Sequence, residues 1–263
     1  MTYEMLQRHA EDMRRVAVAV AMGGRPEGDR ALVEREFADL PDAFGPLLDL
    51  PDPARYQGKI DRIDSVLSGL STGGDGHRAN PQLRDLTGAL RNWTGPAAER
   101  FRDGFLEPWP AYIRNQYTVG LVLRQALEAQ REIWVRARQD ADQIGEQGLG
   151  AMRASGDCTR TEWTITFTVL ASVAAVAAVP LTGGLALAAG GVAGLAQIAA
   201  ATGPQDAPQT TFSADDPVEV AERVREAVTR LRAGIHERWE ATAQALRTTG
   251  QTVRNRPELF GWQ

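Results

Sequence analysis

The sequence lacks most of the residues that would point to a chemical function. It contains a single cysteine, Cys158, so it can form no internal disulfide and no cysteine metal cluster. The histidines His9, His77 and His236 stand in three separate segments, and none has a second ligand at metal-binding spacing on a helix. We therefore expect no metal and no cofactor.

Sequence motifs for catalysis and for nucleic-acid binding are also missing. There is no glycine-rich phosphate loop with a lysine and no nucleophile elbow. Acidic pairs such as Asp215-Asp216 are explained by helix capping or by exposed helix faces. The formal net charge of −5, without a basic stripe interleaved with aromatics, argues against a nucleic-acid partner. We expect no catalytic residues and a protein that is not an enzyme.

An ordinary export signal is missing as well. The apolar run at residues 16–22 is too short and follows acidic residues, whereas a signal peptide needs a basic start and a cleavage site. Lys59 is the only lysine beside many arginines, which indicates codon bias in a GC-rich genome and hence an actinobacterial source.

Charge is missing altogether between Glu162 and Asp206. The block divides into two apolar arms, 163–179 and 185–202, which a Pro/Gly turn would join into a helical hairpin. At about 1.5 Å per residue each arm reaches roughly 25–27 Å, slightly short of a hydrocarbon core of about 30 Å. The two arms rely on Ala and Gly rather than on Leu, Ile and Phe. Small residues of this kind favour close helix packing over membrane insertion.

Two interpretations of this block therefore stay open, and the soluble, buried hairpin is the preferred one. The other is a membrane-inserting or pore-forming hairpin over residues 163–202. The residues that would shape such a hairpin are Trp163, Pro180, Gly183, Gly184, Gly190, Gly191 and Gly194.

The rest of the chain predicts helices, because apolar residues recur at steps of three, four and seven and no stretch alternates as a strand would. We expect an all-α fold, an elongated multi-helix bundle with long antiparallel helices and a central Ala/Gly-rich apolar hairpin. Four segments are predicted: N-terminal helices at 1–78, a Trp-x-Gly helical hairpin at 79–155, the uncharged hairpin at 156–205, and a C-terminal amphipathic helix with a tail at 206–263.

Individual signals predict where helices begin and end. Pro108 and Pro110 should break the helix that precedes them, and a long helix should follow from about Ile113 to Ile144. A loop is expected at 203–212. Asp216, Pro217 and Glu219 form a capping-box pattern for a last helix that reaches about Leu246 and would cover the uncharged hairpin.

A sharp turn is predicted at Trp93-Thr94-Gly95. Gly95 permits the reversal, Pro96 suits the first position of the next helix, and Phe101 lies on its apolar face. The indole of Trp93 would close the end of the bundle, either against its own helices or against a partner helix.

This turn, with the following Pro96-Ala97-Ala98 and Phe101, resembles the Trp-x-Gly helical hairpins of ESX (type VII) secretion substrates and their PE/PPE and EspB-like relatives. The likeness covers roughly residues 81–150. The chain is also similar to the N-terminal delivery regions of actinobacterial polymorphic toxins, in which a Trp-x-Gly part precedes an Ala/Gly-rich hairpin.

The resemblance implies a protein that is secreted or held in the cell envelope through type VII secretion. Its partner would be another helical protein or a second copy of the chain, with membrane contact as a further expectation. The residues that would carry recognition or secretion are Trp93, Gly95 and Phe101. The family's Tyr-x-x-x-Asp/Glu export signal has no counterpart among the four tyrosines.

Overall fold

The computed structural model describes residues 3–70, 85, 88–157, 160–171 and 207–261. These residues form two compact units that interleave along the sequence. Unit 1 contains residues 3–53, 131–171 and 207–240, and unit 2 contains residues 54–130 and 241–261 with the gaps just given. The four-segment division stays a prediction.

The all-α fold class is confirmed. The two longest helices, α8 (Trp109–Ala154) and α11 (Pro217–Asn255), contain 46 and 39 residues, and each runs through both units. Unit 1 also holds α1 (Tyr3–Ala21), η1 (Glu27–Asp29), α2 (Arg30–Glu36), α3 (Leu40–Ala43), α4 (Gly45–Leu48), η3 (Ser155–Asp157) and α9 (Thr168–Ala171). Unit 2 also holds α5 (Ala54–Leu70), α7 (Pro96–Phe101), η2 (Arg102–Leu106) and η4 (Pro257–Phe260).

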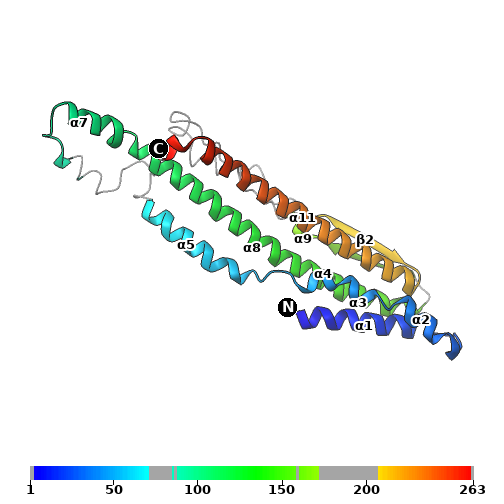
Figure 1. The fold of residues 1–263 in the computed structure, drawn as a ribbon. Coiled ribbons are helices and arrows are strands. Elements are labelled where there is room, and N and C mark those ends of the chain that lie inside the picture. Colours follow the sequence, from blue (N-terminus) through cyan, green and yellow to red (C-terminus); the bar gives the residue numbers. More distant parts are fainter. Residues whose placement is uncertain (1–2, 71–84, 86–87, 158–159, 172–206, 262–263) are drawn as a thin grey trace. The chain divides into compact units, whose positions relative to one another are not determined.

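At Gly148, α8 packs closely against both α1 and α11, whose ribbons run beside it in unit 1 (Figure 1). A Cβ atom on Gly148 would lie 2.8 Å from Val224 Cγ2 of α11 and 2.9 Å from Met13 Cε of α1. The resulting core is mainly apolar, with Asp140 and Ser155 among its few buried polar residues. It includes the fully buried side chains of Met13, Phe37, Phe44, Ile133, Ile144 and Leu231.

The expectation that the chain contains no strand is wrong. β1 (Thr161–Thr166) pairs antiparallel with β2 (Gln209–Ala214), and Trp163 lies opposite Phe212 with ring centroids 5.7 Å apart. Trp163 and Ile165 of β1 and Phe212 and Ala214 of β2 are buried, while Thr164 and Thr211 on the other face hydrogen-bond through their hydroxyls at 3.0 Å. Six residues that include β-branched or aromatic side chains and alternate with a period of two suffice for a strand.

Two further expectations are corrected by this sheet. Trp163 does not begin a helical arm, since it is a buried strand residue. The segment expected as a loop at 203–212 is already strand from Gln209. The remaining hairpin residues, Pro180, Gly183, Gly184, Gly190, Gly191 and Gly194, lie outside the described residues.

The described end of the uncharged block is fixed to unit 1 by side chains of α8 and α11. The buried carboxylate of Asp140 accepts hydrogen bonds from Thr168 N and Oγ1, at 3.0 and 2.6 Å, and from Val169 N at 2.8 Å. Arg238 donates to the carbonyl of Leu170 at 2.5 Å. A Cβ on Gly234 of α11 would lie only 2.6 Å from Leu170 Cδ2, so α9 packs closely on α11.

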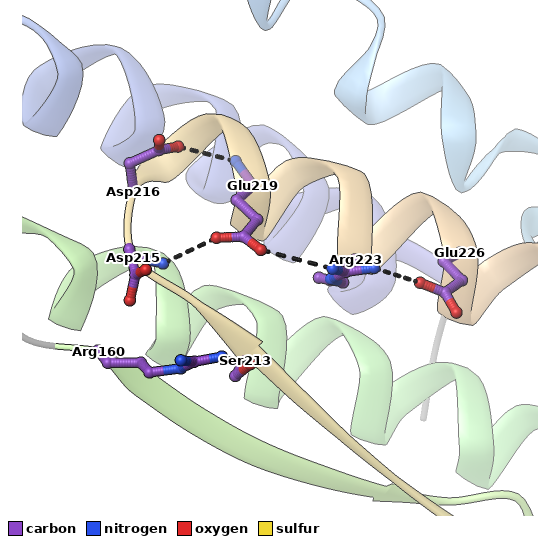
Figure 2. Close-up of polar contacts among 7 residues, drawn as sticks. All are labelled: Arg160, Ser213, Asp215, Asp216, Glu219, Arg223 and Glu226. Atoms are coloured by element: carbon purple, nitrogen blue, oxygen red, sulfur yellow. Dashed lines mark hydrogen bonds and ion pairs between the residues drawn. The ribbon is translucent and has the colours of Figure 1, made fainter.

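The capping box at the start of α11 is present (Figure 2). Asp216 Oδ1 accepts a hydrogen bond from Glu219 N at 2.9 Å, and the Glu219 carboxylate accepts one from Asp215 N at 3.0 Å. Glu219 also pairs with Arg223, at 3.4 Å, which in turn pairs with Glu226. The helix therefore begins where the sequence pattern predicts, with two amide donors satisfied by side chains.

In unit 2, α5 and the first half of α8 pack antiparallel. Leu67 contacts Gly120, where a Cβ would lie 2.7 Å from Leu67 Cδ2, and Arg124 bonds to Asp64 at 2.5 Å. On another side of α8, Val122 and Ala126 pack with Ala245 and Leu246 of α11. Among the described residues, no helix combines the length and the hydropathy that a membrane crossing needs.

Candidate functional site

The Trp93-Thr94-Gly95 turn adopts a backbone that requires glycine. Gly95 has φ 99° and ψ 174°, a region that other residues avoid. Its carbonyl accepts the first helical hydrogen bond from Glu99 N at 3.1 Å, and Pro96 occupies the first position of α7. The sequence therefore specifies a reversal at this point and the direct start of a new helix.

An aromatic row follows from this turn. We use that term for Trp93, Phe101, Phe105 and Trp109, whose neighbouring ring centroids are 5.6, 5.2 and 4.9 Å apart. The last three residues repeat every four positions across α7, the π-helical turn η2 and the first residue of α8. Such distances are typical of offset or tilted aromatic pairs. Trp93 and Phe101, which the sequence singles out, are thus brought into contact.

The π-helical turn η2 connects α7 to the start of α8 and so joins the first part of the aromatic row to Trp109, beyond Pro108. Glu107 N bonds to Arg102 O at 2.9 Å, a five-residue step, and α8 then begins at Trp109 with Pro110 in its first turn. Because neither proline can donate a helical hydrogen bond, the chain restarts its helix there. The break predicted at Pro108 and Pro110 is confirmed.

The start of α8, where the aromatic row ends, is bound to the segment 259–261. Asn115 Nδ2 donates to the carbonyl of Leu259 at 2.7 Å, and Gln116 Nε2 donates to that of Phe260 at 3.2 Å. Gly261, with φ 73°, lies against Tyr112, where a Cβ would be 2.9 Å from Cδ2. The first turns of α8 are therefore bound to the segment 259–261.

Part of the aromatic row is open to solvent. Trp93 is 41% exposed and Phe105 is 39% exposed, although both belong to residue types that dominate protein interfaces. Trp109 was missed; its spacing of four from Phe105 is the signal that could have found it. The arrangement offers an apolar, aromatic edge to a partner's side chains.

No metal-binding group of side chains emerges from the described residues. Clusters of three or more His, Cys, Asp or Glu able to hold a metal are not found among them. The buried Asp140 is engaged by Thr168 and Val169, and burial raises its pKa while these hydrogen bonds lower it. Its geometry is that of a structural cap on α9.

Asp142, one half-turn further along α8, gives a pH prediction. Burial raises its pKa from 3.8 to about 6, and the nearby Glu146 adds to this while His9 and Arg138 oppose it. Because the folded pKa lies above the unfolded one, the free energy of unfolding falls as the pH rises from about 4 to about 6.

We expect Asp142→Asn to remove the fall in the free energy of unfolding between about pH 4 and pH 6. At pH 7 it should raise the free energy of unfolding by about 1 kcal/mol, a value reduced for the solvent that reaches this half-buried group. Below about pH 4 wild type and variant should unfold alike, because both side chains are then neutral. Urea unfolding across this pH range measures the effect. A variant that is less stable than wild type at pH 7 would contradict it.

Comparison with known proteins adds no relative to this description. No family model, no curated protein and no solved structure matches the chain.

Proposed function

We propose that the chain is a non-enzymatic helical protein associated with type VII secretion. It would act in the cell envelope or outside the cell by packing its helices with a partner protein or with a second copy of itself. The observation that carries the proposal is the Trp93–Gly95 turn with its partly exposed aromatic row. The turn has the residues on which the resemblance to Trp-x-Gly proteins rests.

Physical reasons support recognition at this place. Aromatic side chains contribute large contact areas, and the tilted contact of Trp93 with Phe101 and the stacking of Phe101 on Phe105 fix their positions before a partner arrives. A partner helix that covers Trp93 and Phe105 would remove their apolar surface from water, at roughly 25 cal/mol per Å². Fixed aromatic anchors are the residues that dominate helix-binding surfaces.

The first test is export in an actinobacterial host with and without the type VII ATPase. We expect the protein in the medium or envelope of the intact host and its retention in the host without the ATPase. Unchanged export in both hosts, or a protein confined to the cytoplasm of both, would contradict the proposal.

The second test assigns the function to the aromatic row. In Trp93→Ala/Phe105→Ala we expect export, or recovery in a complex with a helical partner or second copy, to fall at least tenfold. Leu32→Ala removes an exposed apolar side chain of unit 1 and should change neither. Normal far-ultraviolet circular dichroism of both variants excludes misfolding. If the purified protein instead floats with liposomes, and Ala174→Arg/Ala189→Arg abolishes this, the membrane-inserting alternative is favoured.

A further inference from the structure

A groove of about 360 Å³ lies within unit 1, apart from the aromatic row. One wall is the stripe Arg232, Ile235, His236 and Trp239 of α11, which the helical repeat places on one face. Trp134 of α8 and the chain around α4 complete it. This volume suits one or two side chains of a ligand.

The inside of the groove is apolar and aromatic. Leu47 and Leu50 are buried beneath it, Trp134 and Ile235 are half-buried, and Trp239 is 43% exposed. Trp239 belongs to no aromatic pair among the described residues. An indole held at the edge of an apolar hollow offers both a ring face for packing and an N–H for donation.

The rim of the groove carries charges that the fold does not use. The side chains of Arg232, His236 and Asp49 make no hydrogen bond or ion pair within the described part of the chain, and all three residues are exposed. Other arginines of α11 are engaged: Arg225 bonds to Asp39 at 2.7 Å and Arg238 to the carbonyl of Leu170. Arg232 and His236, one helical turn apart on α11, therefore both offer N–H donors to an acceptor in the groove.

We propose that this groove binds a segment of a partner protein that combines a large apolar side chain with a neighbouring carboxylate. The apolar side chain packs between the indoles of Trp134 and Trp239, on Leu47 and Leu50. The carboxylate accepts hydrogen bonds from Arg232, whose charge complements it, and from a ring N–H of His236. Asp49 at the rim disfavours ligands that bring a second acid. This inference is independent of the aromatic row and of type VII secretion.

Three short peptides test the two requirements with the full chain. The probe is N-acetyl-Glu-Phe-amide, and its controls are N-acetyl-Gln-Phe-amide, without the carboxylate, and N-acetyl-Glu-Ala-amide, without the ring. Binding is followed through the indole N–H signals in ¹H–¹⁵N spectra, assigned by Trp134→Phe and Trp239→Phe. We expect the probe to shift the Trp134 and Trp239 signals, the Gln peptide to bind about threefold more weakly, and the Ala peptide to leave them unchanged.

Variants of the protein complete the test. Trp239→Ala should abolish the shift at Trp134, and because its side chain is already partly exposed the fold should survive, as circular dichroism checks. Arg232→Gln should make the Glu and Gln peptides bind equally, whereas Arg153→Gln, which removes an exposed charge of α8 away from the groove, should keep the threefold preference. The proposal is overturned if millimolar probe shifts neither indole, or if the wild-type protein binds the Glu and Gln peptides equally.

Discussion

Replacing Asp140 by alanine should lower the free energy of unfolding by about 3 kcal/mol, one of the two largest effects we expect in this chain. Its carboxylate is 1% exposed and accepts the amide hydrogens of Thr168 and Val169 and the hydroxyl of Thr168. Without it these donors stay buried and unpaired, and each such group costs about 1–3 kcal/mol. Burial raises the pKa of Asp140, which means that its buried negative charge is itself unfavourable. Removing the side chain removes this unfavourable charge but leaves the donors of Thr168 and Val169 without an acceptor.

The matched control for this prediction is Asp216→Ala. Asp216 is also a carboxylate that caps a helix, but it is exposed and accepts one amide hydrogen bond, from Glu219 N at 2.9 Å. Its loss should cost about 1 kcal/mol. Urea unfolding followed by circular dichroism measures both variants. Equal losses in the two would show that the buried hydrogen bonds of Asp140 add nothing to stability.

Hydrogen exchange gives the Asp140 prediction a local readout. In Asp140→Ala the amides of Thr168 and Val169 lose their acceptor, so they should exchange at least tenfold faster than in wild type. The amide of Glu219 donates to Asp216 and not to Asp140, so it should keep its protection against exchange. Unchanged protection at Thr168 and Val169 would contradict the assignment of Asp140 as their cap.

The sequence predicted those features of the fold that depend on residues close together in the chain. The capping box at Asp216 and Glu219, the helix restart at Pro108 and Pro110, and the long helix after it all follow from local backbone chemistry. Each needs only the identity of a few neighbouring residues. The tertiary context does not change their outcome.

The strands were missed because their evidence is divided between two distant segments. Trp163 and Ile165 lie at the start of a long apolar block, and the block as a whole predicts a helix there. The alternation of these two residues with their neighbours becomes decisive only when Phe212 and Ala214, almost fifty residues later, are seen to alternate in the same way and Phe212 is seen to pair with Trp163. Pairing over such a distance cannot be read from a local period.

Only the part of the candidate site that depends on residues close together in the chain was predicted. The turn at Trp93 and Gly95 follows from a few neighbouring residues, whereas the contact of Trp93 with Phe101 was not predicted. The extension through Phe105 to Trp109 depends on a π-helical turn, which no propensity scale indicates. The groove beside Trp239 depends on three segments that only the tertiary fold brings together.

The other large effect concerns the close approach of α1, α8 and α11. Leucine at Gly148 should lower the free energy of unfolding by about 3 kcal/mol, because even its Cβ would lie 2.8 Å from Val224 Cγ2 and 2.9 Å from Met13 Cε. Both neighbours are buried in the core of unit 1, so neither can move aside without disturbing α1 or α11.

Gly150, two residues further along α8, supplies the control because a Cβ there would meet nothing within 4 Å. Leucine at Gly150 should stabilise the protein by about 0.5 kcal/mol, since leucine has a higher helix propensity than glycine. Urea unfolding of Gly148→Leu and Gly150→Leu therefore separates packing from propensity. Opposite signs in the two variants are the expected result. Stabilisation in both would mean that α1 and α11 do not approach α8 as closely as Met13 and Val224 indicate.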